Sequence, residues 1–470
     1  MKLKLSDILQ LEHVEARDFE RPAYFITGVS TDSRSVKSGD LFIPIRGTQF
    51  DGHNFISNAV KAGAAAILAE HRWANMNAAY LRTLPVPQLI VEDSTRALGH
   101  LARIYRRMFK LPILAVGGSN GKTTTKDMIR LVLGSKYNVL ATEGNLNNHI
   151  GVPQTIFRLE KSHTAAVIEV GTNHPGEIDY LCNVLEPTHG LITAIGSEHL
   201  EFFGDLAGVA RAELELFRWI RNNSRADRAV FINGDDRHLA GQARTFKRRV
   251  VYGLRSRTAD VKASGVMLDD RGRASFTVKA RGTSPFTVAL PVPGIHNVQN
   301  ALAAVAVGLR FKVPAGKIQK ALASFAPPGK RMEVLTINGL TVLNDSYNSN
   351  PDSVRAALET LRVMKTSGKK IAVLADMLEL GTSSSEHHRT IASYADRAGI
   401  DCLLTFGPLS KATHEASAVS LKAHYDQKNM LSEYLAELLG PGDIVLVKGS
   451  RGMKMEDVVT FLQERFSKAA

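Results

Sequence analysis

Apolar runs and amphipathic stretches alternate along the chain, and this pattern predicts an α/β protein with mostly parallel sheets. Short runs without polar alternation are typical of strands that helices cover on both faces. In the first part of the chain we expect strands at residues 41–45 and 85–91, and a helix over residues 55–69 that includes the apolar run at its end. A second helix is expected to start with Ser94-Thr95 as its N-cap and to continue to residue 108.

The middle of the chain repeats the strand–helix alternation. An apolar strand at residues 111–116 leads into Gly117-Gly118, and a helix is expected from about Lys122. Further strands are predicted at residues 165–170, 190–195 and 229–232. The stretch from about 246 to 290 differs, because short alternating strands at 273–278 and 285–290 indicate an antiparallel excursion. An alanine-rich helix over residues 295–309 then follows.

The last part of the chain follows Ala326-Pro-Pro-Gly329, a sequence typical of a linker. It predicts a second, smaller doubly wound domain, with a helix at residues 353–361 and strands at residues 340–344, 370–375, 403–406 and 443–447. At roughly 100–200 residues per domain, 470 residues fit three domains. We expect a small N-terminal α/β domain over residues 1–93, a central domain over residues 94–327 with a mostly parallel sheet, and a Rossmann-like domain over residues 328–470.

The composition favours a globular protein of the cytoplasm. Hydrophobic residues make up 44% of the chain, which is enough for several cores. Cys182 and Cys402 are far apart in sequence and neither belongs to a C-x-x-C pair, so we expect a reducing compartment and no thiol metal site. The first eleven residues carry polar Ser6 and Asp7, unlike a signal peptide, and no stretch approaches the ~18 apolar residues of a membrane span.

The net charge of +13 is dispersed, with small basic clusters at residues 103–110 and 247–249. A solvated basic surface is the simplest interpretation, and attraction of small polyanionic substrates is the functional alternative. We expect no nucleic-acid partner, because no nucleic-acid-binding motif accompanies the charge.

The strongest local signal is the string GSNGKTTT at residues 118–125, which follows an apolar strand and opens a helix. Glycines in this context let backbone N–H groups surround phosphate oxygens, which predicts a P-loop for ATP. Lys122 would neutralise the terminal phosphates and Thr123 would place its hydroxyl on Mg²⁺. The spacing is two residues shorter than a Walker A loop, so a simple turn before a helix is the alternative. The candidate ATP-binding residues of this loop are Gly118, Ser119, Asn120, Gly121, Lys122, Thr123 and Thr124.

This loop resembles that of the Mur ligase family and of its relative, folylpolyglutamate synthetase. Six further strings resemble family motifs in the same order, so the resemblance covers nearly the whole chain. They are TEGNLNNHIGVP (142–153), IEVGTNHPGEI (168–178), GSEHLE (196–201), GIHNVQNALAA (294–304), GKRME (329–333) and NDSYNSNP (344–351). The family implies an ATP-dependent ligase that activates a carboxylate as an acyl phosphate and releases ADP and phosphate as an amine attacks.

Three strings are similar to one branch of this family. They are the ending NHPGEI of the acidic loop, DSYNSNP at 345–351 and ADMLELG at 375–381, whereas a D-N-P-R motif typical of another branch has no counterpart. The branch adds D-alanyl-D-alanine to UDP-N-acetylmuramoyl-tripeptide in peptidoglycan synthesis. The alternatives are a family member that adds a different amino acid and a P-loop module that binds ATP without catalysis. We expect a monomer, and the third residue of the acceptor peptide, diaminopimelate or lysine, stays open.

In the N-terminal domain, the strings STDSRSVKSGDLF (30–42) and RGTQFDGH (46–53) resemble the family's site for the UDP-linked substrate, and an ordinary exposed turn plus strand is the alternative. The resemblance implies the following substrate-binding residues: Ser33, Arg34, Phe42, Gly47, Asp51, Gly52, His53, Asn145, Asn147 and Asn148.

The resemblance also implies the catalytic set Lys122, Glu169 and His199. Thr123 and Glu169 would bind a first Mg²⁺, and His199 would help to bind a second. Asn297 and Asn300 would hold the adenine end, although Asn300 has the alternative of packing the start of its helix.

The C-terminal domain would bring further residues onto ATP and would bind the incoming dipeptide. Arg331 would contact the γ-phosphate, Asp345 and Tyr347 the ribose and phosphates, and Asn348 and Asn350 the dipeptide. This requires hinge motion, for which Pro327-Pro328-Gly329 is the candidate.

One position departs from the family, most members of which carry a CO₂-carbamylated lysine in the helix after the histidine motif. Here Glu213 occupies that position. A carbamate and a carboxylate both present anionic oxygens, so Glu213 is a candidate metal ligand without modification. The alternative is a solvent-facing helical residue in a surface salt bridge.

Overall fold

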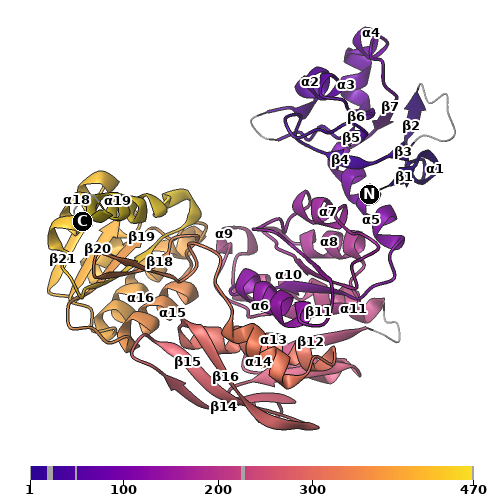
Figure 1. Ribbon diagram of the computed structural model, residues 1–470. Coiled ribbons are helices and arrows are strands. Elements are labelled where there is room, and N and C mark those ends of the chain that lie inside the picture. Colours follow the sequence, from indigo (N-terminus) through magenta and orange to yellow (C-terminus); the bar gives the residue numbers. More distant parts are fainter. Residues whose placement is uncertain (1, 18–24, 48–49, 224–227, 468–470) are drawn as a thin grey trace. The chain divides into compact units, whose positions relative to one another are not determined.

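The computed structural model describes residues 2–17, 25–47, 50–223 and 228–467, which form two compact α/β units (Figure 1). One unit comprises Met1–Ala115, Tyr137–Thr172 and Gly176–His189, and the other comprises Val116–Lys136, Asn173–Pro175 and Gly190–Ala470. The predicted α/β class is confirmed. The boundaries proposed at 93/94 and 327/328 stay predictions.

A five-stranded sheet forms the N-terminal part of the first unit. Its strand order is β2 (Glu15–Arg17), β7 (Gln88–Val91), β6 (Ala66–Glu70), β5 (Asp40–Phe42) and β4 (Gly28–Ser30). The pairs from β4 to β7 are parallel, and β2 is an antiparallel edge strand. The short elements around it are β1 (Leu3–Lys4), α1 (Leu5–Ile8), β3 (Phe25–Ile26), η1 (Gly52–Phe55), α2 (Ile56–Lys61), α3 (His71–Met76) and α4 (Ala78–Leu81).

The long helix expected over residues 55–69 is wrong in its second half. Helix α2 ends at Lys61, and Gly63 adopts φ = +101°, a conformation that breaks a right-handed helix. The apolar residues that follow form strand β6 instead. A short apolar run is equally compatible with a buried strand, which is why the pattern misled.

Helix α5 (Ser94–Arg107) confirms the helix that was predicted to end at residue 108, but its N-cap differs. The side chain of Asp93, one residue before the predicted cap, accepts hydrogen bonds from the backbone N–H groups of Thr95 and Arg96. The first unit also contains β9 (Val139–Ala141), α7 (Gly151–Ile156), β10 (Ala165–Glu169) and α8 (Glu177–Leu185).

The largest sheet has nine strands. Their order is β16 (Thr283–Pro293), β15 (Arg273–Ala280), β14 (Val261–Leu268), β13 (Arg249–Gly253), β12 (Ala229–Asn233), β11 (His189–Ile192), β8 (Ile113–Gly117), β10 and β9. Strands β12, β13 and β14 pair in parallel, whereas β14, β15 and β16 pair antiparallel, so the predicted antiparallel excursion is confirmed.

Eight helices of the second unit accompany the strands of this sheet. They are α6 (Lys122–Gly134), α9 (Leu200–Phe203), α10 (Leu206–Glu213), α11 (Glu215–Asn222), α12 (Arg237–Ala240), η2 (Gly241–Thr245), α13 (Ile295–Arg310) and α14 (Ala315–Ala323). Helix α6 begins at Lys122, as the sequence predicted.

A six-stranded sheet forms the C-terminal part of the second unit. Its order is β17 (Glu333–Ile337), β18 (Leu340–Asp345), β22 (Ile444–Lys448), β19 (Lys370–Ala375), β20 (Cys402–Phe406) and β21 (Leu421–Tyr425). All its pairs are parallel except β17–β18. Its helices are α15 (Pro351–Val363), η3 (Gly381–Ser383), α16 (Ser384–Arg397), α17 (Lys411–Ala416), α18 (Lys428–Leu438), η4 (Arg451–Met453) and α19 (Glu456–Ser467).

The strand order of this sheet indicates where a ligand would bind. The last strand, β22, lies between β18 and β19, and the helices α15 and α16 cover the face opposite to α18 and α19 (Figure 1). Ligands of doubly wound sheets bind where such connections diverge, at the carboxyl ends of the strands. The loops after β18, β19 and β22 are therefore candidates for a site.

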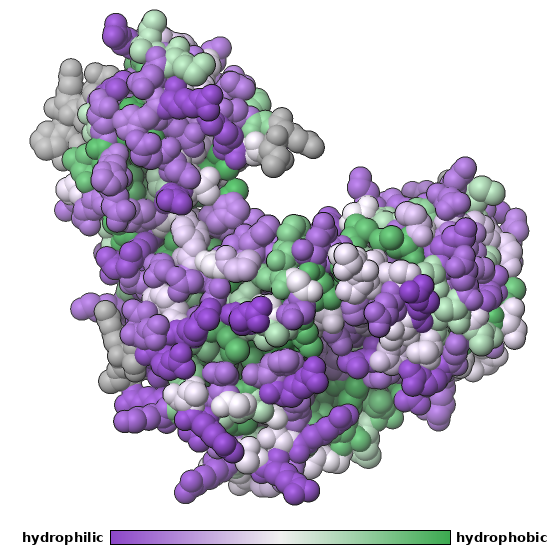
Figure 2. Space-filling model, turned by 180° about the vertical axis from the view of Figure 1, so that it is seen from behind, coloured by the Kyte–Doolittle hydropathy of each residue, from purple (hydrophilic) through white to green (hydrophobic). Residues whose placement is uncertain are grey.

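Figure 2 shows hydrophilic residues spread over the visible face, with smaller hydrophobic areas between them. Among the described residues, no helix has the length and hydrophobicity that crossing a membrane requires.

Candidate active site

The loop between β8 and α6 has a backbone that only glycine tolerates at two positions. Gly118 adopts φ = +116°, and a Cβ atom there would lie 2.2 Å from the Thr193 hydroxyl oxygen. Gly121 adopts φ = +80°, and a Cβ atom there would lie 2.5 Å from the Asn300 side-chain oxygen. Thr193 and Asn300 therefore pack tightly against the two glycines of the loop. The backbone of the loop leads into the N-terminus of a 13-residue helix.

Hydrogen bonds from the segment after β11 hold this loop in shape. The Thr193 hydroxyl donates to the Asn120 carbonyl (2.6 Å), and the Ser119 N–H donates to the Ala194 carbonyl (2.8 Å). The Gly196 N–H donates to the Ser119 hydroxyl (2.9 Å). These contacts preorganise the loop, so binding an anion requires little rearrangement.

Lys122, the first residue of α6, lies beside the carboxylates of Glu198 and Glu213. Its ammonium donates to the Gly118 carbonyl and lies 3.5 Å from a carboxylate oxygen of Glu198. The Glu213 side chain is fully buried and accepts the Gly118 N–H at 2.7 Å, which excludes the solvent-facing alternative for this residue. One ammonium therefore lies beside two carboxyl groups, whose ionisation depends on burial and on nearby charge.

Burial dominates the ionisation of both carboxylates. It raises the pKa of Glu213 to about 8, although Lys122 acts in the opposite direction. Burial likewise raises the pKa of Glu198 above its usual range. A bound cation would favour the ionised form of such groups.

Three candidate metal ligands have a buried oxygen without a hydrogen-bond partner within the described ranges. They are Thr123 Oγ1 and Glu213 Oε1 in the second unit and Glu169 Oε2 in the first unit. The other oxygen of Glu169 accepts a hydrogen bond from the Asn147 amide (2.8 Å). Hydroxyl and carboxylate oxygens are the ligands that Mg²⁺ prefers, so each of these side chains has the chemistry of a Mg²⁺ ligand.

Over residues 2–17, 25–47, 50–223 and 228–467, no group of three or more His, Cys, Asp or Glu side chains forms a metal site by itself. Mg²⁺ is usually bound by one or two carboxylates together with substrate phosphates rather than by an all-protein cage. The arrangement therefore fits a metal that arrives with a nucleotide.

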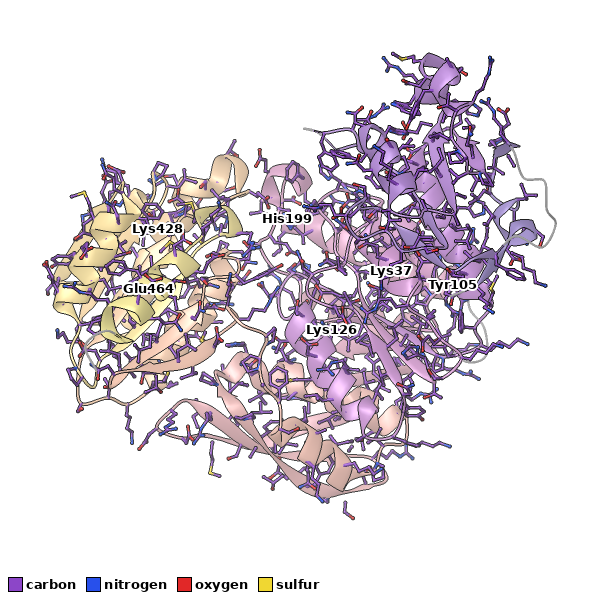
Figure 3. All side chains as sticks on the ribbon, turned by 45° about the horizontal axis from the view of Figure 1, so that its top comes forward. Lys37, Tyr105, Lys126, His199, Lys428 and Glu464 are labelled. Carbon is purple, nitrogen blue, oxygen red and sulfur yellow. The ribbon has the colours of Figure 1, made fainter. Side chains whose placement is uncertain are left out.

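His199 immediately precedes α9 and has a left-handed backbone, with φ = +50° (Figure 3). Its Nδ1 lies 2.5 Å from a carboxylate oxygen of Glu379, and its Nε2 lies 4.0 Å from Glu198 Oε2. The hydrogen bond with His199 lowers the pKa of Glu379 below its usual value. The imidazole thus lies between the carboxylates of two distant segments.

The start of α13 packs against Gly121 of the loop and Thr125 of α6 through the side chain of Asn300. The Thr125 hydroxyl donates to the Asn300 side-chain oxygen (3.1 Å), and the Asn300 amide donates to Asn297 (3.1 Å). The Asn297 amide donates to the Pro293 carbonyl. These bonds tie both asparagines into the helix start, the packing role that the sequence left open for Asn300.

Charged and aromatic side chains gather at the carboxyl ends of β18 and β22. Asp345 accepts hydrogen bonds from the Met332 N–H (3.0 Å) and from the buried ammonium of Lys448 (2.6 Å). Arg331 lies over the Tyr347 ring, with its guanidinium carbon 3.8 Å from the ring centre. The exposed Asn348 accepts the Arg451 N–H (3.3 Å).

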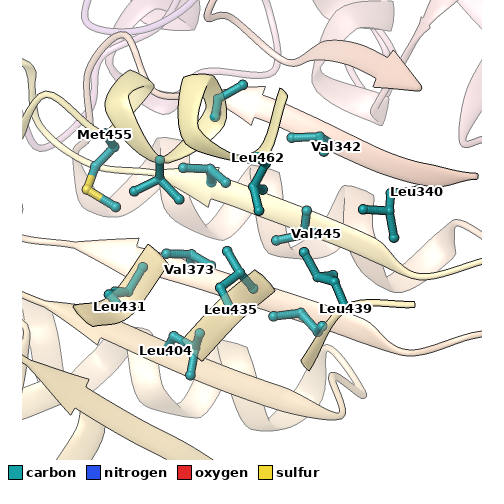
Figure 4. Packing of buried hydrophobic residues seen from close by; sticks show 14 of the residues in the cluster. Leu340, Val342, Val373, Leu404, Leu431, Leu435, Leu439, Val445, Met455 and Leu462 are labelled. Carbon is teal, nitrogen blue, oxygen red and sulfur yellow. The ribbon is translucent and has the colours of Figure 1, made fainter. Parts of the chain in front are cut away.

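The core beneath this edge fixes the strands that carry these residues. Alternate side chains of β18, β19 and β22 pack against α18 and α19 (Figure 4). Val342, Val373 and Val445 contribute from the strands, and Leu431 and Leu462 from the helices. Because side chains alternate along a strand, the remaining ones point to the opposite face of the sheet. The polar residues Asp345 and Lys448 lie at the carboxyl ends of β18 and β22.

Two residues at the start of α15 contact the central part of the second unit. The Asn350 amide donates to the Asn120 side-chain oxygen (3.0 Å), while its own oxygen caps α15 at Ser353. The Ser197 N–H donates to Asp352 (3.0 Å). These bonds connect the third section of the chain with the phosphate loop and the histidine motif.

The residues predicted to bind the UDP-linked substrate belong to the first unit. Arg34 is exposed and pairs with Asp32 (2.7 Å), Ser33 lies between them, and Asn145 is exposed. The Asn148 side chain caps α7 by accepting the N–H groups of Ile150 and Gly151. Residues 48–49 of the predicted motif lie outside the described residues.

Four of these predicted residues also support the fold. Phe42 is 1% exposed and belongs to the core of the five-stranded sheet. His53 is buried, hydrogen-bonded to Asp51 (2.6 Å) and stacked on Trp73. A Cβ atom on Gly52 would lie 2.7 Å from backbone atoms of Ile45, so the chain segments approach closely there.

Three residues of this region were not predicted as site residues. Glu198, Glu379 and Asp352 contact Lys122, His199 and Ser197 respectively. Glu198 and Glu379 belong to motifs that the sequence did single out, but nothing in the spacing assigned them a role. Their position beside the predicted residues depends on packing between segments up to 180 positions apart.

Family comparisons cover most of the chain. Residues 25–106 match the model described as Mur ligase family, catalytic domain, and residues 116–308 match the Mur ligase middle domain. Residues 330–451 match the model described as Mur ligase, glutamate ligase domain. The chain belongs to the Mur ligase family and has its three domains.

Curated relatives identify the branch that this chain resembles. It is 36% identical to the UDP-N-acetylmuramoyl-tripeptide–D-alanyl-D-alanine ligase of Escherichia coli over 98% of both chains. It is 35% identical to the ligase of the same name from Bacillus subtilis over 93% of both chains. Two solved structures are similar: MurF from Acinetobacter baumannii (TM-score 0.89, 30% identity, 99% of both chains) and MurF from Thermotoga maritima in complex with ADP (TM-score 0.82, 28% identity, 95% of this chain and 99% of that one).

Proposed function

We propose that this protein joins D-alanyl-D-alanine to UDP-N-acetylmuramoyl-tripeptide with consumption of ATP, in peptidoglycan synthesis. The names of full-length relatives above 30% identity support this reaction. The observation that carries the proposal is a glycine-constrained phosphate loop with Lys122 beside the partly buried carboxylate of Glu198 and the fully buried one of Glu213.

The reaction needs little covalent chemistry from the protein. A carboxylate oxygen leaves poorly, so the γ-phosphoryl group of ATP converts it to an acyl phosphate, which the amine of the dipeptide attacks through a tetrahedral oxyanion. The protein contributes charge neutralisation and positioning. Lys122 would neutralise the transferring phosphoryl group, and the N-terminus of α6 would bind its oxygens.

Mg²⁺ is the cofactor whose ligand preference matches the oxygens of Thr123, Glu169 and Glu213 that lack hydrogen-bond partners among the described residues. We assign Thr123 and Glu169 to a first ion and His199 and Glu213 to a second, on the basis of the family resemblance and these oxygens. When bound, the ions would neutralise phosphate charge. Chelation with EDTA should abolish phosphate release, and added Mg²⁺ should restore it.

The other substrates are assigned by domain. The N-terminal domain would bind the UDP-linked peptide through the exposed Arg34 and its neighbours. The C-terminal domain would contact ATP through Arg331 and Tyr347 and the dipeptide through Asn348 and Asn350. The expected monomer stays a prediction, which light scattering tests.

Phosphate release measures the proposed reaction directly. Purified protein with ATP, Mg²⁺ and UDP-N-acetylmuramoyl-tripeptide should release phosphate with D-alanyl-D-alanine but not with single amino acids. Release with glutamate alone would mean a different family ligase. Nucleotide binding without release under any condition would mean a binding module without catalysis.

Lys122→Ala connects this activity to the loop. We expect kcat to fall by about 10²–10³-fold, the usual effect of removing one group that stabilises transition-state charge. Binding of the UDP-linked substrate should persist, because the candidate residues for that substrate belong to other segments. Lys161→Ala, an exposed lysine before β10, serves as the matched control.

A further inference from the structure

The imidazole of His199 and the carboxylate of Glu379 meet although 180 positions separate them. His199 lies in the segment after strand β11 of the nine-stranded sheet. Glu379 lies in the loop after β19 of the six-stranded sheet. Their Nδ1–Oε2 distance is 2.5 Å. The proposed reaction assigns a role to His199 alone, so the contact with Glu379 needs its own explanation.

Backbone contacts hold the two segments together at the same place. The Glu201 N–H donates to the Glu379 carbonyl (3.1 Å). A Cβ atom on Gly381 would lie 3.3 Å from the Glu201 Cα, and Gly381 has φ = +58°. Glu379 itself has φ = +62°, a conformation that costs energy for a residue with a side chain. Packing therefore imposes a specific direction on the Glu379 side chain.

The contact determines which imidazole nitrogen has a lone pair. An ionised carboxylate can only accept hydrogen bonds, so Nδ1 of His199 must carry the proton that Glu379 accepts. In a neutral ring, Nε2 is then unprotonated, and it is the nitrogen that lies 4.0 Å from Glu198 in the charged cluster around Lys122. The ring is therefore oriented with its lone pair toward the phosphate loop.

We propose that Glu379 is a positioning residue that fixes the tautomer and direction of His199, so that Nε2 is ready to bind the metal. This rests on the proposed function, which makes His199 a metal ligand. Histidines that bind metals usually donate their other ring N–H to a carboxylate or carbonyl, and loss of that partner weakens metal binding by about 10–100-fold. Because Glu379 comes from the C-terminal domain, the imidazole is positioned only while that domain contacts the central one.

Two measurements test this proposal, and the first needs neither metal nor substrate. Long-range ¹H–¹⁵N NMR of ¹⁵N-histidine protein, with the His199 signals assigned by their loss in His199→Asn, reports the tautomer of each ring. We expect protonated Nδ1 in the unaltered protein and a shift toward protonated Nε2 in Glu379→Ala. Glu379→Gln should retain protonated Nδ1, because the glutamine carbonyl still accepts its proton.

The second measurement is the binding of Mn²⁺ in the presence of ADP, followed by electron paramagnetic resonance. Glu379→Ala should raise the Mn²⁺ dissociation constant by about tenfold or more, and Glu379→Gln should raise it less. Glu386→Ala, an exposed residue in the first turn of α16, is the matched control and should change neither the tautomer nor the affinity. Gly381→Ala should shift the tautomer and the affinity in the same direction as Glu379→Ala but by less, because its added Cβ crowds the Glu201 backbone while Glu379 stays in place.

The possible outcomes separate this inference from the proposed function. An unchanged tautomer or an unchanged Mn²⁺ affinity in Glu379→Ala would overturn the positioning role. If His199→Asn itself leaves Mn²⁺ affinity unchanged, the metal role of His199 fails and this inference fails with it. Phosphate release by the unaltered protein decides the ligase activity independently of both results.

Discussion

Glu213 is the residue predicted to take the place of the family's carbamylated lysine, and its surroundings fit a carboxylate. One oxygen accepts the N–H of Gly118, and the other has no hydrogen-bond partner among the described residues. Its burial against Lys122 and Glu198 makes an uncompensated charge costly. A metal ion beside Glu213 would offset that cost, which is the reason for proposing this side chain as a ligand.

We predict that activity does not depend on CO₂, since Glu213 supplies its carboxylate without modification. Removing bicarbonate should leave the phosphate-release rate of the unaltered protein unchanged. Glu213→Gln keeps an acceptor for Gly118 but loses the charge, and it should lower kcat/KM by roughly 10–100-fold. Glu213→Lys should be inactive without bicarbonate and should regain activity when bicarbonate is added.

Glu433→Gln and Glu433→Lys are the matched controls, because Glu433 is exposed on α18. Full activity of Glu213→Gln would show that the second metal site, if present, does not use this carboxylate. Dependence of the unaltered protein on bicarbonate would contradict the assignment of Glu213 to the lysine position.

Ion pairs connect helix α5 with the C-terminal end of α8, and they should make the stability of the first unit depend on pH. Glu186, the C-cap of α8, pairs with Arg107 (2.6 Å) and Arg103 (3.0 Å) of α5. Burial alone would raise the pKa of Glu186, but the hydrogen bonds from Arg107 and Arg103 outweigh it and lower the pKa below 4.5. Arg106 adds a hydrogen bond to the Leu185 carbonyl (2.9 Å).

We predict that Glu186→Gln lowers the free energy of unfolding at pH 7 by roughly 1 kcal/mol, after allowance for screening of these partly exposed arginines. A lowered carboxylate pKa contributes stability above its unfolded value and loses it as pH falls through the folded value. The difference between Glu186→Gln and the unaltered protein should therefore shrink below about pH 4.5. Urea unfolding across pH measures it, with the exposed Glu464→Gln as control. A difference that is constant with pH would contradict the role of this ion pair.

Most elements could be predicted because they depend on local patterns. The strand at residues 370–375 was predicted with its observed bounds, and α13 and β20 differ from prediction by one residue. Strands β17 and β21 were missed, since edge strands are half-exposed and lack a continuous apolar run. The N-cap of α5 was misplaced by one residue because Asp93, Ser94 and Thr95 are all good cap residues.

The phosphate loop was predictable for the same reason, since its glycines and Lys122 follow one another in a strand–loop–helix context. Glu198, Glu379 and Asp352 were not, because their roles arise only where distant segments pack together. The orphan oxygens of Thr123 and Glu169 also depend on burial, which residue type alone does not reveal.

Within the second unit, two side chains of the C-terminal domain contact the phosphate loop and the histidine motif. Asn350 binds Asn120, and Asp352 accepts the Ser197 N–H. The approach at Ser197 is close, because a Cβ atom on Gly196 would lie 2.8 Å from Asp352 Oδ2. These side chains thus favour an arrangement in which the third domain is docked at the nucleotide loop.

We predict that Asp352→Ala shifts the protein toward an undocked arrangement. Loss of one hydrogen bond of this kind is worth about 1 kcal/mol, or roughly a fivefold change in the populations. Spin labels at Arg211→Cys and Glu433→Cys, both exposed, report the distance between the two domains. The distance distribution should broaden in Asp352→Ala, and the KM for ATP should rise.

The native cysteines do not interfere with this labelling. Cys182 and Cys402 are fully buried, and burial raises the pKa of the Cys402 thiol to about 11, so it is poorly reactive. Glu464→Ala, at an exposed position of α19, is the control variant. An unchanged distance distribution in Asp352→Ala would show that other contacts determine docking.

The tight packing under Gly118 and Gly121 has a consequence for antibacterial chemistry. A compound that takes its affinity from the backbone N–H groups of this loop would depend on two positions where a side chain is strained by the backbone conformation and crowded by its neighbours. A resistance substitution at either glycine would strain the loop that binds the nucleotide, so we expect resistance to arise at other residues.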